Sequence, residues 1–180
     1  MLREKLVECG AIKFGEFVLA SGKKSSYYVD IKKASTKHEI LNMMGDLLAE
    51  NVRGDLLAGV ELGAVPLVAI TAVKAKKDYL IIRKEKKGYG TSKLVEGDYR
   101  EGMVVDIIED VVTTGGSVLR AVKILRELGL QVNRVICVVD REEGGKEALE
   151  KEGVELIPLI KARDLLENAT FSQDPLHPQS

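Results

Sequence analysis

The chain has 180 residues, of which 27 are basic and 28 acidic, and its formal net charge at pH 7 is −1. This balance gives no reason to expect nucleic acid or an anionic membrane as a partner, so any anion-binding site must be local. The length suits one α/β domain with an ample core. No apolar run approaches the roughly twenty residues that a membrane span requires.

The cysteines and histidines narrow the chemistry further. Cys9 and Cys137 are the only cysteines, and the apolar run around Cys137 suits a buried thiol rather than a disulfide, which fits a reducing cytoplasm. His38 and His177 lie far apart in the sequence, so a zinc site has almost no ligands to draw on. We therefore expect a cytoplasmic protein without a dedicated metal-ligand cluster.

The N-terminal segment, about residues 1–35, predicts a small hood, to which the C-terminal end of the chain would add. Its expected elements are a helix over Leu2–Cys9, an extended segment over Ile12–Leu19, a turn over Ser21–Ser26 and a strand over Tyr27–Ile31. Thr36 and Glu39 then form a capping-box pattern, which predicts the start of a helix that runs to about Val52 and ends at Gly54.

Strands alternate with helices over the rest of the chain. The expected strands are Asp55–Val60, Tyr79–Arg83, Met103–Ile108, Arg134–Val139 and Glu155–Ile160, and the expected helices are Ala64–Ala75, Val118–Leu128 and Lys146–Lys151. This alternation predicts an α/β fold with a mostly parallel, doubly wound sheet. We expect one domain over 1–180, with its core at about residues 36–160, a short helical segment after the last strand and a loose tail over Phe171–Ser180.

The segment Val104–Ser117, VVDIIEDVVTTGGS, carries the strongest chemical signal. An apolar run ends at Glu109 and Asp110, and small and hydroxyl residues then lead into a helix. Their N–H groups and hydroxyls are suited to a phosphate at the positive end of that helix, and the carboxylates to a vicinal diol. An ordinary strand-to-helix connection with solvated acids is the alternative, but it requires neither feature. The pattern indicates a ribose-phosphate site.

Two further segments are suited to anionic groups. The glycine-rich stretch between Arg83 and Met103 is strongly basic and has almost no apolar periodicity, which indicates either a mobile lid over about residues 84–102 that neutralises pyrophosphate or a solvated charged loop. Arg141 follows a predicted strand, at the end where doubly wound sheets bind ligands. Its planar guanidinium suits a carboxylate, although the glutamates after it also allow a surface ion-pair cluster.

These motifs resemble those of the orotate phosphoribosyltransferases, a branch of the type I phosphoribosyltransferases, over nearly the whole chain. Val104–Ser117 is similar to the family's motif for 5-phosphoribosyl 1-pyrophosphate (PRPP), and Arg83–Gly90, RKEKKGYG, to its arginine-lysine loop. Phe17–Asp30, FVLASGKKSSYYVD, resembles its orotate signature, and Val139–Gly145, VDREEGG, its segment at the end of a strand.

The resemblance implies transfer of ribose 5-phosphate from PRPP to orotate, which gives orotidine 5′-phosphate and pyrophosphate in de novo pyrimidine (UMP) synthesis. It implies Mg²⁺ bound mainly through PRPP and water, and a homodimer whose basic loop acts in the partner's site. The implied catalytic residues are Lys87, Asp110 and Glu109. The implied PRPP-binding residues are Arg83, Lys84, Lys87, Tyr89, Glu109, Asp110, Val111, Val112, Thr113, Thr114, Gly115, Gly116 and Ser117. The implied orotate-binding residues are Thr113, Arg141, Tyr28 and Val29.

The sequence departs from the family pattern at three positions. Familiar bacterial members have a histidine at the position of Tyr89, many relatives have a lysine at that of Ala20, and some have a lysine at that of Leu62. Either Lys23 or Lys24 replaces the lysine missing at Ala20, or both are simply solvated. The departures leave open a transferase for another nucleobase. A second alternative is a non-catalytic PRPP sensor of the same fold, which should carry an added basic surface for nucleic acid.

Overall fold

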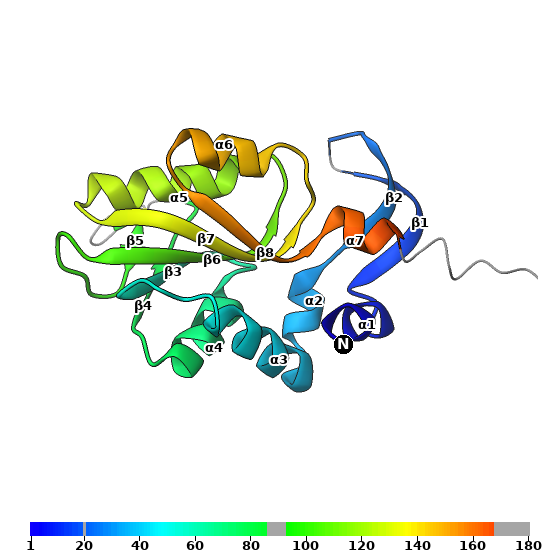
Figure 1. Ribbon diagram of the computed structural model, residues 1–180, viewed down its shortest axis with the longest axis horizontal. Helices are drawn as coiled ribbons and strands as arrows, with labels where there is room; N and C mark the ends of the chain where they lie inside the picture. Colours follow the sequence, from blue (N-terminus) through cyan, green and yellow to red (C-terminus); the bar gives the residue numbers. More distant parts are fainter. Residues whose placement is uncertain (20, 86–92, 168–180) are drawn as a thin grey trace, which may run out of the picture.

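The computed structural model describes residues 1–19, 21–85 and 93–167 (Figure 1). The described residues contain a six-stranded sheet of order β5-β4-β3-β6-β7-β8, in which only the β4–β5 pair is antiparallel. Its strands are β3 (Leu56–Val60), β4 (Tyr79–Ile82), β5 (Val95–Glu96), β6 (Val104–Val112), β7 (Gln131–Asp140) and β8 (Glu155–Lys161). The predicted mostly parallel sheet is confirmed.

Helices cover both faces of this sheet. In Figure 1, α3 (His38–Ala49) and α4 (Val65–Ala75) lie below it, and α5 (Gly116–Glu127) and α6 (Gly145–Lys151) lie above it. Since the central strands are covered on both sides, they are continuous apolar runs, and all five residues of β3 are buried. In α5 the buried residues recur every three or four positions, as on one face of a helix.

A smaller layer stands at one end of the sheet (Figure 1). It contains α1 (Leu2–Glu8), the antiparallel pair β1 (Ile12–Val18) and β2 (Lys24–Val29), α2 (Ile31–Ser35) and α7 (Ala162–Glu167). Leu6 of α1 and Leu165 of α7 belong to the same buried cluster, and Arg3 Nη2 donates a 3.4 Å hydrogen bond to the Leu165 carbonyl oxygen. The two ends of the described chain therefore meet in this layer.

The structure corrects the expectation for residues 21–39. The strand β2 begins at Lys24, inside the predicted turn, and ends at Val29, since Asp30 caps α2 through a 3.3 Å hydrogen bond from Lys33 N. The capping-box prediction is wrong: Thr36 lies at the end of α2, where its hydroxyl donates to the Lys33 carbonyl oxygen. The next helix, α3, has no side-chain cap.

Two further differences concern strands. The short strand β5 was not expected. It lies in the segment predicted as a loop, and it pairs with β4. The strand β6 extends to Val112, beyond the predicted end at Ile108, because its pairing with β7 continues to Asp140. The acidic pair therefore belongs to the strand itself. No helix in the described part of the chain is long and apolar enough to cross a membrane.

Candidate active site

A cavity of about 470 Å³ lies where β6 and β7 end, between the sheet and the small layer. The carboxyl ends of parallel strands are the usual ligand-binding edge of a doubly wound sheet. The lining residues are Leu19, Ser21, Lys23, Tyr28, Val29, Ile31, Lys32, Asp110, Val111, Thr113, Thr114, Arg141 and Glu143. Segments far apart in the sequence thus contribute polar groups to one space.

The acidic pair lies in the second half of β6. Neighbouring side chains of a strand point to opposite faces, and Glu109 is only 6% exposed while Asp110 lines the cavity. Burial, together with the adjoining Asp110 side chain, raises the pKa of Glu109 well above its usual value. Glu109 Oε1 also accepts a 3.0 Å hydrogen bond from Asp110 N. The two carboxyl groups therefore sit in different environments.

The loop after β3 packs directly against this pair. A Cβ atom at Gly63 would lie 2.2 Å from Asp110 Oδ2 and 2.8 Å from Asp110 Cγ. Since real Cβ contacts are longer than 3.0 Å, only glycine leaves room for the Asp110 carboxylate as it stands. The Glu61–Leu62 peptide bond of the same loop is cis.

The backbone of the turn between β6 and α5 lies close to the backbone at the start of α6. Gly115 has φ +90°, a conformation that glycine adopts at little cost. A Cβ atom there would lie 3.2 Å from Gly145 Cα, and Gly145 N donates a 3.0 Å hydrogen bond to the Thr113 carbonyl oxygen. Because α5 begins directly after this turn, its first N–H groups have no partners within the helix and are suited to an anion.

Arg141 lies at the other side of the cavity and is 8% exposed. Its guanidinium carbon lies 4.3 Å from the centroid of the Tyr27 ring. Its Nε donates to Glu143 Oε1 at 3.0 Å and its Nη2 to Ser25 Oγ at 3.2 Å. The guanidinium group is therefore oriented from three sides.

The described part of the basic segment is held to two neighbouring elements. Lys84 N donates a 2.6 Å hydrogen bond to Glu61 Oε1, and Arg120 of α5 donates to the carbonyl oxygens of Arg83 at 3.3 Å and Lys84 at 2.8 Å. Arg83 Nε is paired with Glu96 Oε1 at 2.9 Å. In this arrangement Arg83 and Lys84 lie outside the cavity lining, and Lys87 and Tyr89 lie outside the described residues.

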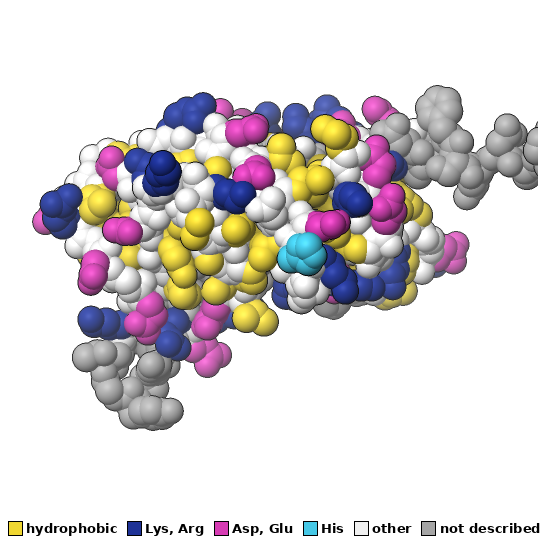
Figure 2. Space-filling model, turned by 90° about the horizontal axis from the view of Figure 1, so that it is seen from below, with side chains coloured by type: hydrophobic (Ala, Val, Ile, Leu, Met, Phe, Trp, Pro, Cys, Tyr) yellow, Lys and Arg dark blue, Asp and Glu magenta, His cyan; other side chains and the backbone are white. Residues whose placement is uncertain are grey.

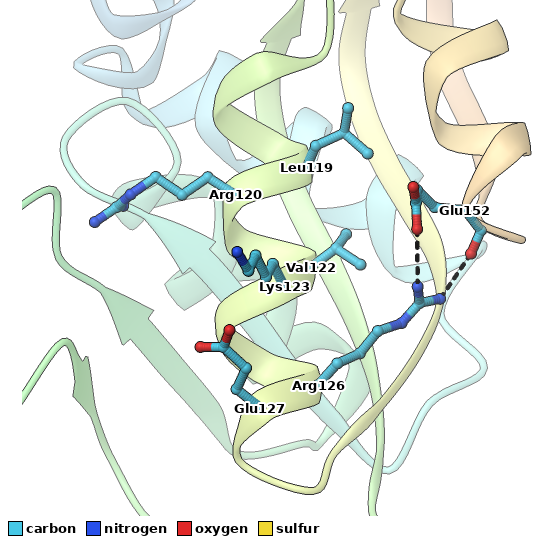
Figure 3. Close-up of a pocket in the computed structure, with 7 residues that line it drawn as sticks. All are labelled: Leu119, Arg120, Val122, Lys123, Arg126, Glu127 and Glu152. Atoms are coloured by element: carbon cyan, nitrogen blue, oxygen red, sulfur yellow. Dashed lines mark hydrogen bonds and ion pairs between the residues drawn. The ribbon is translucent and has the colours of Figure 1, made fainter.

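A second hollow of about 560 Å³ lies along the outer side of α5 (Figure 3). Figure 3 shows Arg126 turned to Glu152, while Arg120 points away from that pair. Arg126 Nη2 also donates to the carbonyl oxygens of Val132 and Glu152, both at 2.9 Å. Arg126 and Glu152 are thus paired with each other, and Arg120 donates to the Arg83 and Lys84 carbonyl oxygens. The cavity at the strand ends is the better candidate because it lies at the usual ligand-binding edge of such a sheet.

Comparison with known proteins gives the family of this chain. Residues 33–163 match the family model for the phosphoribosyl transferase domain. The orotate phosphoribosyltransferase of Methanocaldococcus jannaschii is 55% identical over 162 residues, which cover 89% of this chain and 92% of that protein. The chain belongs to the orotate phosphoribosyltransferase family.

Solved structures of the family have the same fold. The orotate phosphoribosyltransferase of Aeropyrum pernix superposes with a TM-score of 0.85 at 35% identity, over 95% of this chain and 99% of that one. The enzyme of Mycobacterium tuberculosis in complex with PRPP superposes with a TM-score of 0.74 at 30% identity, over 92% and 99% of the two chains. The family fold thus extends over most of the described chain.

Among the residues predicted for this family's site, one group lines the cavity and another lies beside it. Those that line it are Tyr28, Val29, Asp110, Val111, Thr113, Thr114 and Arg141. Those that do not are Arg83, Lys84, Glu109, Val112, Gly115, Gly116 and Ser117. The second group belongs to the segment directly after β4, the second half of β6 and the start of α5.

Sequence reasoning missed several residues of this cavity. Lys32 lines it from α2, a helix that was not expected, and Glu143 lines it beside Arg141. Of the two lysines considered as replacements at Ala20, Lys23 lines the cavity and Lys24 does not. Ala20 itself lies outside the described residues. The available signal was the position of Lys32 two residues after Asp30, a good N-cap residue that marks a helix start.

Proposed function

We propose that the protein catalyses, in this cavity, the transfer of ribose 5-phosphate from PRPP to orotate, which gives orotidine 5′-phosphate and pyrophosphate for pyrimidine (UMP) synthesis. The observation that carries the proposal is the common cavity itself. It combines Asp110 at an acidic strand end, the threonines Thr113 and Thr114 that lead into α5, and the buried Arg141. The helix start is suited to a phosphate, the acidic strand end to a ribose diol, and the arginine to a carboxylate.

The proposed roles follow the chemistry of each group. The N–H groups and hydroxyls of 113–117 bind the 5-phosphate, and Asp110 with Glu109 holds the ribose hydroxyls. Arg141 and Thr113 bind orotate at its polar edge, with Tyr28 and Val29 against its flat ring. The ring nitrogen of orotate releases its proton to water and forms a bond to the anomeric carbon as the bond to pyrophosphate breaks. The carboxylates stabilise the positive charge that develops on the ribose.

The residues present also fit Mg²⁺ bound chiefly through PRPP and water. The described residues contain no group of three or more His, Cys, Asp or Glu side chains that would hold a metal by themselves, whereas Asp110 offers hard oxygen atoms beside the proposed ribose position. When bound, Mg²⁺ would neutralise charge on the departing pyrophosphate. Glu109 and Asp110 would hold it through the ribose hydroxyls.

The proposal includes the basic segment and a second copy of the chain. Arg83, Lys84, Lys87 and Tyr89 bind pyrophosphate, with Lys87 acting in catalysis from the partner's loop. Figure 2 shows hydrophobic side chains gathered on the face of α3 and α4, and on α4 Val73 is 72% exposed. Such a face supports a homodimer. The free cysteines support a cytoplasmic location.

The test is an activity assay on the purified protein. Orotate, PRPP and Mg²⁺ are mixed and the loss of the ultraviolet absorbance of orotate is followed, with PRPP or Mg²⁺ omitted in the controls. We expect loss of absorbance only in the complete mixture, and a severe decrease in the variants Asp110→Asn and Lys87→Ala. No loss of absorbance, with PRPP binding still seen by calorimetry, would indicate another nucleobase or a sensing role. Full turnover in both variants would refute the assigned catalytic roles.

A further inference from the structure

The contacts of Arg141 leave one edge of its guanidinium group for a ligand. An arginine side chain has five N–H donors, and in the described structure the Nε donor is used by Glu143 and one Nη2 donor by Ser25. The donors of Nη1 and the second donor of Nη2 remain. Nη1 and Nη2 together form an edge of the kind that binds a carboxylate through two parallel hydrogen bonds.

Hydrogen bonds from two backbone N–H groups hold the segment that joins Arg141 to Glu143. Arg141 N donates a 2.9 Å hydrogen bond to the Val112 carbonyl oxygen, and Glu142 N donates a 2.8 Å hydrogen bond to Asp140 Oδ1. The Glu142 side chain is in turn paired with Arg163 of α7. Glu143 therefore follows a rigid segment, unlike a surface carboxylate that meets an arginine by chance.

Three groups hold the guanidinium plane itself. The Tyr27 ring lies under it, Ser25 Oγ accepts from one end, and Glu143 Oε1 accepts from the other. Ser25 Oγ is itself directed by its 2.8 Å hydrogen bond to the Tyr27 carbonyl oxygen. An arginine restrained in this way loses little conformational freedom when it binds a planar anion.

We propose that Glu143 is a positioning residue, which holds Arg141 so that its Nη edge meets the carboxylate of the nucleobase substrate. The inference rests on the proposed function, in which Arg141 binds orotate. Glu143 also balances the charge of the buried Arg141 while the cavity is empty. Its hydrogen bond to Nε leaves the binding edge open, so it orients the arginine without blocking it.

The test compares Glu143→Ala with Glu143→Gln, which keeps an acceptor oxygen but removes the charge. We expect Glu143→Ala to lower kcat/KM for orotate about tenfold, mainly through KM, and to leave KM for PRPP within about twofold. Glu143→Gln should recover most of the loss. Glu147→Gln is the matched control, because Glu147 is an exposed carboxylate four positions further along the chain and its replacement removes the same charge.

A double-mutant cycle with Arg141→Ala separates this inference from the proposed function. If Glu143 acts through Arg141, Glu143→Ala has no further effect on orotate binding, measured by calorimetry, once Arg141 is removed. An unchanged orotate affinity in Arg141→Ala would refute the assignment of Arg141 and the inference with it. If Arg141→Ala weakens orotate binding but Glu143→Ala leaves it unchanged or tightens it, only the positioning role is refuted.

Discussion

Replacement of Gly63 by alanine tests whether the loop after β3 sets the position of the acidic pair. The new Cβ atom would lie 2.2 Å from Asp110 Oδ2, whereas close carbon–oxygen contacts are about 3.3 Å. The carboxylate or the loop must therefore move by about 1 Å. The φ angle of Gly63 is not in the positive range, so alanine itself fits the backbone.

A displacement of about 1 Å at a reacting group costs about 100-fold in rate, which corresponds to about 2.7 kcal/mol of transition-state stabilisation. We expect Gly63→Ala to lower kcat/KM for PRPP by this factor, while the melting temperature changes by only a few degrees. Steady-state kinetics at varied PRPP, with thermal unfolding in parallel, measures both.

The control is the same substitution in an Asp110→Ala background. With the carboxylate absent the steric conflict disappears, so Gly63→Ala should cost little further activity. Kinetics within about threefold of the parent protein for the single variant would refute the reasoning, and so would an equal further loss in both backgrounds.

Three further predictions concern stability and the basic segment. Burial holds the pKa of Glu109 well above its usual value of 4.5, so above that pH the folded state binds more protons than the unfolded state and stability falls as pH rises. Glu109→Gln should therefore raise the melting temperature more at about pH 7 than at about pH 4. An equal change at both pH values would contradict this. Asp106 is fully buried and accepts hydrogen bonds from Arg53 N at 2.7 Å and Gly54 N at 2.8 Å, so Asp106→Ala should lower the free energy of unfolding by about 2–4 kcal/mol in urea denaturation with KM unchanged. Arg120→Ala removes both hydrogen bonds to the start of the basic segment and should raise KM for PRPP about threefold to tenfold, whereas an unchanged KM would show that these bonds do not position the segment.

Local patterns predicted most of the sheet and its covering helices. The strands β3 and β7 are buried on both faces, so their apolar runs are visible in the sequence. The elements that were missed are short: α2 has five residues and β5 has two. Tertiary contacts stabilise them rather than local propensity: Ile31 of α2 is buried in the core, and β5 pairs with β4. The wrong capping box has the same origin, since α2 places Thr36 at its own end.

Local sequence patterns also identified part of the candidate site. The acidic pair ends an apolar run within β6, and the threonine- and glycine-rich turn and Arg141 each follow an apolar strand, so all three were recognisable. Three relations were not recognisable: the contact of Gly63 with Asp110, the place of Lys32 in the cavity, and the hydrogen bond of Ser25 to Arg141. Each joins residues that no single segment contains.

The sequence by itself determined the alternation of strands and helices, the threonine- and glycine-rich turn and the family resemblance, because burial, turns and helix starts leave marks within a few residues. Only the tertiary structure decided which side chains meet. The parallel pairing of β3 with β6 brings the loop of Gly63 beside Asp110, and the small layer brings Ser25 and Tyr27 to Arg141. Such contacts depend on strand order and on the packing of distant segments, which a local pattern does not record.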